Sequence, residues 1–228
     1  QNNDSGVNYN TAVGYAAAAG LTDGTNNTAV GGLALDATVT RDDNTAIGYY
    51  ALSANTSGTD NTAVGKQAAL LNTTGSSLVA IGVGALDENT SGDSNIGIGV
   101  SALTSNTTGS ANVAIGTNAL QAATTVSNNT AVGKDAGYYV LSTGNTLVGY
   151  EAYQGAGSSA STGANNTALG FAAMESVSAG TSDAGNNVAV GYQSLIGITD
   201  GDNNVAIGAN AGDALTTMDD CVFIGLNA

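Results

Sequence analysis

The stretch Asn61-Thr-Ala-Val-Gly-Lys-Gln-Ala-Ala-Leu70 decides the fold of this chain. An apolar residue pair that ends on a glycine predicts a short strand followed by a tight corner. The four residues after the glycine predict a second strand. Copies of this stretch follow one another along all 228 residues, so the chain is a repeat protein.

Thirteen corner glycines mark the repeats, and they lie 17 residues apart except for one step of 16 and two of 21. This period is too short for a helix pair or a propeller blade, and it predicts one turn of a β-solenoid. We therefore expect an all-β, parallel β-solenoid of about 13 coils that forms one domain, 1–228, with longer loops at 155–163 and 176–185. The corner glycines are Gly14, Gly31, Gly48, Gly65, Gly82, Gly99, Gly116, Gly133, Gly149, Gly170, Gly191, Gly208 and Gly225.

The composition excludes several classes of partner. Three Lys and Arg residues stand against eighteen acids, a net charge of −15 that would repel nucleic acid and anionic lipid. No apolar run approaches the roughly 20 residues of a membrane span. The absence of proline fits continuous backbone ladders. The single cysteine, Cys221, permits no internal disulfide and indicates a small ladder residue, with a reactive or intermolecular thiol as the alternative.

Two neighbouring apolar columns precede the glycine. The residue two before it is alanine in ten coils, and the residue one before it is always Val, Ile or Leu. Neighbours on a strand point to opposite faces, so both faces of the sheet must be covered. We expect the Val/Ile column inside the coil and the small-residue face against another chain, in a homo-oligomer. A wider coil that encloses both columns is the alternative.

Two further columns carry polar or aromatic side chains. Lysines occur in the column after the glycine, so this column should lie outside, where Tyr15, Tyr49, Tyr150 and Tyr192 could contact a ligand such as a glycan or could shield a seam. The other column holds asparagines whose stacked amides can hydrogen-bond from coil to coil, a structural role. It consists of Asn10, Asn27, Asn44, Asn61, Asn95, Asn112, Asn129, Asn145, Asn166, Asn187 and Asn204.

The sequence gives no support for catalysis or for a cofactor. It has no histidine, no nucleophile set, no phosphate loop and no metal-type cysteine spacing, so we expect no enzyme. The acids Asp42, Asp43, Asp200 and Asp202 lie in loops, where calcium bridging is a weak alternative to solvated turn residues. Ice binding needs a regular outward threonine array. It is disfavoured because the threonine column gives way to Val79, Ile96 and Val113, and because this column shares a face with the Val/Ile column that we expect inside.

The repeat units Asn61-Thr-Ala-Val-Gly with Ala68, and Asn112-Val-Ala-Ile-Gly with Ala119, resemble the head repeats of trimeric autotransporter adhesins. The full 17-residue unit, ending in Asn-Thr-Thr-Gly, is similar to repeat regions of bacterial and phage tail-fibre-like proteins. The resemblance implies a trimer of parallel β-rolls with a role at a cell or virion surface. Fold resemblance alone does not identify a receptor.

Both chain ends lack a cap, and joining Ala228 to the Gln1 of another copy would preserve the 17-residue spacing. This preserved spacing predicts either that copies stack end to end into a filament or that the chain is an excerpt, cut in register with the repeat, of a longer fibre. The sequence therefore predicts an extracellular structural fibre or adhesin shaft that self-associates, with a receptor- or glycan-binding head module as the alternative.

Overall fold

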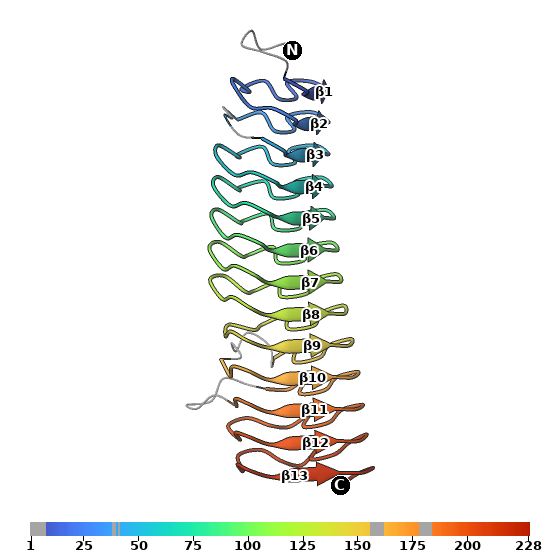
Figure 1. The fold of residues 1–228 in the computed structure, drawn as a ribbon. Coiled ribbons are helices and arrows are strands. Elements are labelled where there is room, and N and C mark those ends of the chain that lie inside the picture. Colours follow the sequence, from blue (N-terminus) through green and yellow to red (C-terminus); the bar gives the residue numbers. More distant parts are fainter. Residues whose placement is uncertain (1–7, 38–39, 41, 156–161, 178–183) are drawn as a thin grey trace. The chain divides into compact units, whose positions relative to one another are not determined.

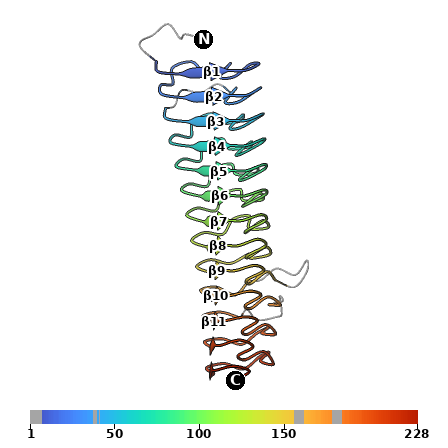
Figure 2. The same ribbon diagram turned by 90° about the vertical axis from the view of Figure 1, so that its right-hand side faces the viewer.

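The computed structural model describes residues 8–37, 40, 42–155, 162–177 and 184–228. Over these residues the chain forms two compact units, Gln1–Ala111 and Asn112–Ala228. Both are parallel β-solenoids with one three-residue strand in each coil, and the described residues contain no helix (Figures 1 and 2). The all-β solenoid prediction is confirmed. The long loops predicted at 155–163 and 176–185 fall largely outside the described residues.

The strands of each unit pair in chain order and in register, so that equivalent residues of successive coils face each other, as Thr28 faces Thr45. The first unit holds β1 (Thr11–Val13), β2 (Thr28–Val30), β3 (Thr45–Ile47), β4 (Thr62–Val64), β5 (Val79–Ile81) and β6 (Ile96–Ile98). The second holds β7 (Val113–Ile115), β8 (Thr130–Val132), β9 (Thr146–Val148), β10 (Thr167–Leu169), β11 (Val188–Val190), β12 (Val205–Ile207) and β13 (Val222–Ile224).

The corner glycines are required by their backbone conformation and by close packing. All thirteen have φ between +133° and +143°, a region that side chains rarely adopt. At Gly149 an added Cβ would overlap the carbonyl oxygen of Gly170 in the next coil. The strand therefore turns at a position of the repeat where no side chain can be placed.

The prediction of a second strand after the corner glycine is wrong. Residues two and four positions after the corner adopt the left-handed conformation, as at Leu33 (φ 57°) and Leu35 (φ 50°), so the chain turns instead of extending. This conformation disfavours β-branched side chains, and neither column contains Val, Ile or Thr. The turn directs Leu35 into the coil, where it is fully buried.

The interior of each coil is filled by small and medium side chains. The middle strand residue is fully buried in β2 to β12, most often as alanine, and the leucines four residues after the corner lie across from it. At Gly97 an added Cβ would already lie 3.2 Å from Cγ of Leu86. Opposite a leucine such as Leu86, the cross-section of the coil therefore accepts alanine in the strand and excludes a branched side chain.

The prediction that the Val/Ile column lies inside the coil is wrong. Alanine occupies the interior, and the first and third strand residues point outward, because neighbours on a strand alternate between faces. Ile47 is 39 % exposed and Leu169 is 45 % exposed, whereas Ala46 and Ala168 are fully buried. The wider coil that would enclose both columns is not formed.

Candidate interaction surface

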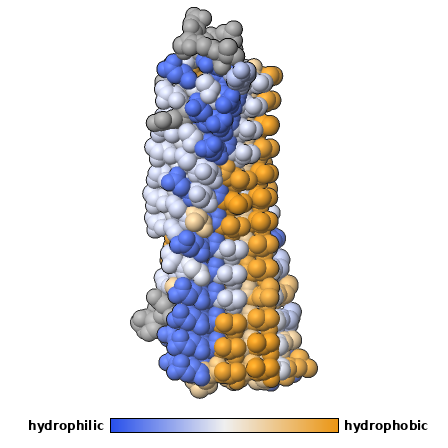
Figure 3. Space-filling model, viewed as in Figure 1, coloured by the Kyte–Doolittle hydropathy of each residue, from blue (hydrophilic) through white to orange (hydrophobic). Residues whose placement is uncertain are grey.

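In each unit the outward strand residues form a surface that we call the strand face: the first and third residues of β1 to β6 in one unit and of β7 to β13 in the other. Figure 3 shows its third-residue column as hydrophobic in every coil. The first-residue column alternates between Thr and Val or Ile. It holds Thr from β1 to β4, Val79 and Ile96 in β5 and β6, Val113 in β7, Thr from β8 to β10 and Val from β11 to β13.

The threonines of the strand face present their hydroxyls to solvent. In the described part of the chain, the side chains of Thr28, Thr45 and Thr130 make no hydrogen bond within the protein and are half-buried. The strand face therefore mixes methyl groups with a few hydroxyls and carries no charge. Its threonine and Val/Ile columns share the outward side, so a buried face does not argue against ice binding, whereas the interruption of the threonine column by Val79, Ile96 and Val113 still does.

The tyrosine column is exposed, as predicted, but its members differ in geometry. Tyr150, Phe171 and Tyr192 form a stack that we call the aromatic ladder, with centroid distances of 5.2 and 5.4 Å and interplanar angles of 15° and 17°. Tyr49 instead packs edge-on against Tyr50, with the ring centroids 4.4 Å apart, and Tyr15 is 82 % exposed. The structure thus joins two of the four candidate tyrosines into one group, through Phe171.

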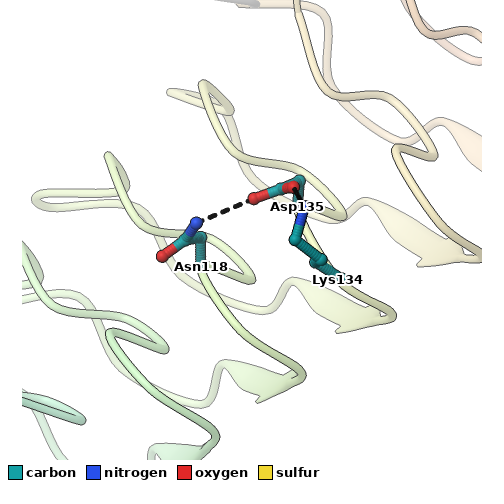
Figure 4. A network of polar contacts seen from close by, with 3 residues as sticks. All are labelled: Asn118, Lys134 and Asp135. Atoms are coloured by element: carbon teal, nitrogen blue, oxygen red, sulfur yellow. Dashed lines mark hydrogen bonds and ion pairs between the residues drawn. The ribbon is translucent and has the colours of Figure 1, made fainter. Parts of the chain in front are cut away.

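A polar network adjoins the aromatic ladder (Figure 4). Asn118 donates its side-chain amide to Oδ1 of the buried Asp135 at 2.9 Å, and Lys134 contacts Oδ2 of Asp135 at 2.6 Å. The hydrogen bond with Asp135 raises the pKa of Lys134, which therefore stays charged. The ammonium lies 5.1 Å from the ring centroid of Tyr150 and occupies the position of a further rung.

The predicted asparagine column is buried, apart from the half-buried Asn10, and links successive coils. The backbone N–H of Asn44 donates to Oδ1 of Asn27 at 3.0 Å, and the amide of Asn187 donates to the carbonyl of Gly201 at 2.8 Å. These bonds satisfy backbone groups at the start of each strand and place no reactive group at the surface. The column has a structural role in this geometry.

A second amide column was not singled out from the sequence. Each member donates to the carbonyl of the glycine three residues later, as Asn106 does to Gly109 at 3.0 Å. Each member after the first also donates to the preceding amide, as Asn106 does to Oδ1 of Asn89 at 2.8 Å. Its signal in the sequence is the Asn-Thr-x-Gly spacing. The column consists of Asn55, Asn72, Asn89 and Asn106, all fully buried.

The candidate calcium ligands accept hydrogen bonds between coils. Asp42 accepts from the backbone N–H of Thr25 at 2.7 Å, and Asp202 accepts from that of Gly185 at 2.7 Å. Asp43 accepts from the side chain of Asn26 at 3.1 Å, while Oδ1 of Asp200 is buried and makes no hydrogen bond within the described chain. Over the described residues, no group of three acids, cysteines or histidines could hold a metal ion.

Within the described ranges, no helix is long and apolar enough to cross a membrane. Cys221 is half-buried in the asparagine column, where its backbone N–H donates to Oδ1 of Asn204 at 2.9 Å. This position matches that of a ladder residue.

No protein-family model and no curated protein matches this chain. The function must therefore be argued from the surface itself.

Proposed function

We propose that this chain is a subunit of an extracellular structural fibre or adhesin shaft, and that its main activity is self-association through the strand face. One observation carries the proposal: in its strands the chain mostly keeps alanine inside and places Val, Ile or, in β10, Leu outside. Contiguous exposed apolar patches of more than a few hundred Å² are rare on soluble monomers and mark interaction sites. Ile81 (38 % exposed) and Ile207 (41 %) belong to such a continuous column in their units.

The regular spacing of the strand face favours a second copy of the chain as its partner. Strands in a ladder lie about 4.7–4.9 Å apart, so the outward side chains of each unit repeat with that period. Another copy has the same period, and each rung can therefore meet an equivalent rung. A partner without the repeat would match only a few coils.

The distribution of charge supports the same partner. The net charge of −15 comes from acids in the loops and turns, and the strand face itself carries none. Association through this face therefore leaves the charges in water, where they keep the assembly soluble. Three copies are the stoichiometry that the adhesin-head resemblance implies, and a cell or virion surface is the corresponding location.

The experiment is a measurement of mass in solution, by light scattering and by sedimentation over a range of concentrations. We expect the wild-type chain to form a discrete oligomer and Ile81→Glu to dissociate it. Leu71→Glu is the matched control, because Leu71 is 45 % exposed but lies outside the strand face. A monodisperse wild-type monomer would contradict the proposal. Electron microscopy of the same material tests the end-to-end filament, which isolated short particles would count against.

Ice binding is a second candidate, favoured by the outward position of the threonine column. Threonine hydroxyls and the methyl groups of valine or isoleucine repeat along β2 to β4 at the strand spacing, a regular array that could order water. This function requires that the strand face remain uncovered. Thermal hysteresis by a monomeric chain would support it over self-association, and its absence would remove it. Glycan stacking gains no such support from the aromatic ladder, because both faces of Tyr150 and of Phe171 are already covered.

A further inference from the structure

The aromatic ladder is the largest ordered aromatic group on the described surface outside the strand face. Its three rings remain 39 %, 47 % and 50 % exposed although they stack on one another. The middle ring, Phe171, is covered on both faces by Tyr150 and Tyr192, and Lys134 lies over the far side of Tyr150. What the aromatic ladder exposes is therefore mainly ring edges, together with the face of Tyr192 that Phe171 does not cover.

Exposed ring edges select a particular kind of partner. A sugar or a flat ligand binds an aromatic side chain through the ring face, and both faces of Tyr150 and of Phe171 are covered here. Ring edges are apolar and carry a weak positive charge, so they pack well against aliphatic side chains and oxygen acceptors of a protein. Stacking also fixes the rings before binding, which lowers the entropy lost on association. The aromatic ladder thus suits a protein surface that contains methyl groups and hydroxyls.

The aromatic ladder is continuous with the strand face of the second unit. Tyr150 follows Gly149, which follows Val148 of the strand face, and the same order holds in the next two coils. Only a glycine without a side chain separates each ring from the outward aliphatic residue. The apolar surface therefore extends around the corner of the coil at these three levels.

We propose that the aromatic ladder anchors the interface between copies of this chain, at the rim of the strand face. This inference rests on the proposed self-association. In a cyclic assembly of parallel copies, the corner edge of one strand face meets the strand-start edge of the next copy. That edge carries Thr146, Thr167 and Val188, which supply methyl groups and hydroxyl oxygens that can pack against ring edges. The partner repeats at the same strand spacing, so each ring can meet one rung.

The column differs between the two units, which makes the inference specific. In the first unit no two successive coils carry rings, because the equivalent positions hold Tyr15, Gly32, Tyr49, Lys66, Val83 and Val100. In the second unit the rings occupy three successive coils. Aromatic residues dominate the energetics of many interfaces, and the second unit should therefore contribute more to association.

The test compares the concentration at which the oligomer dissociates, measured by sedimentation, for four proteins. Phe171→Ala removes the middle ring and both stacks, and we expect dissociation at a concentration at least about tenfold higher than for the wild type. Tyr139→Ala is the control, because it removes a ring that pairs with Tyr138 away from the corner, and it should leave association unchanged. Ala209→Tyr should add a rung after Tyr192 and lower the dissociation concentration.

The outcomes separate this inference from the proposed function. If the wild type associates and Ile81→Glu dissociates it, but Phe171→Ala associates like the wild type, the aromatic ladder faces solvent or another partner and the inference is overturned. A wild-type monomer overturns both. Circular dichroism on each variant checks that the solenoid is intact, and Ala209→Tyr gives a readout that does not depend on removing a side chain.

Discussion

The pair Leu147 and Gly137 allows a direct test of how the coil interior is packed. Leu147 stands in β9 where most strands have alanine, and it is fully buried. Gly137 stands in the preceding coil where most coils have leucine, and an added Cβ there would lie 2.7 Å from Cδ1 of Leu147. Phe223 and Gly212 repeat the exchange, with an added Cβ 3.3 Å from the Phe223 ring. A larger strand residue is thus matched by a missing side chain across from it.

The magnitudes follow from this geometry. Leu147→Ala should lower the free energy of unfolding by about 4 kcal/mol, in the upper part of the range for such substitutions, because Gly137 has no side chain to fill the cavity. Gly137→Leu alone should cost about 3 kcal/mol through overpacking against Leu147 and Leu120. The double variant restores the usual alanine and leucine, and it should lie within about 2 kcal/mol of the wild type.

The assay is urea unfolding followed by circular dichroism at one fixed protein concentration, because association would otherwise alter the apparent stability. The backbone at Gly137 has φ +63°, close to the conformation that leucine adopts at this position in other coils, so the substitution tests packing rather than backbone strain. A coupling free energy of at least about 3 kcal/mol between the two sites supports the packing scheme. Additive effects would refute it.

Three further predictions concern single residues. Asn89→Ala should lower the free energy of unfolding by about 3 kcal/mol in urea titrations, because it leaves buried amide groups of the second column without partners. Gly149→Ala should prevent the corner from closing and yield little folded protein, which circular dichroism and limited proteolysis would detect. Burial raises the pKa of Asp87, so the folded state holds this proton more tightly than the unfolded state and loses stability as pH rises from the ordinary carboxyl range through the raised pKa. Asp87→Asn should therefore gain stability relative to the wild type at pH 7 but not at pH 4, and an equal effect at both values would contradict this assignment.

The repeat made the architecture predictable, whereas the backbone conformation after the corner glycine could not be predicted from it. The spacing of the glycines alone predicts stacked coils, and the asparagine column follows from the same alignment. The segment after the glycine resembles a short strand because alanine and leucine stand next to each other, three and four positions after the corner, before the polar loop. Left-handed backbone at Leu33 and Leu35 carries no strong sequence signal, since leucine rarely adopts it. Only the absence of β-branched residues from these two columns indicates it.

The choice of which apolar column lies inside could not be made from hydropathy, because alanine, valine and isoleucine all count as apolar. It is made by the cross-section of the coil. Leucines such as Leu86 reach across the interior and leave room for an alanine or a glycine, but not for an isoleucine. A solitary chain gains most by burying its larger side chains, since the gain grows with the apolar area removed from water. This chain does the reverse in both units. A sequence that places larger strand side chains outward at every coil, against the general rule, keeps this arrangement for a function. Covering the strand face with another copy is the function that would remove these side chains from water, which one chain alone does not do.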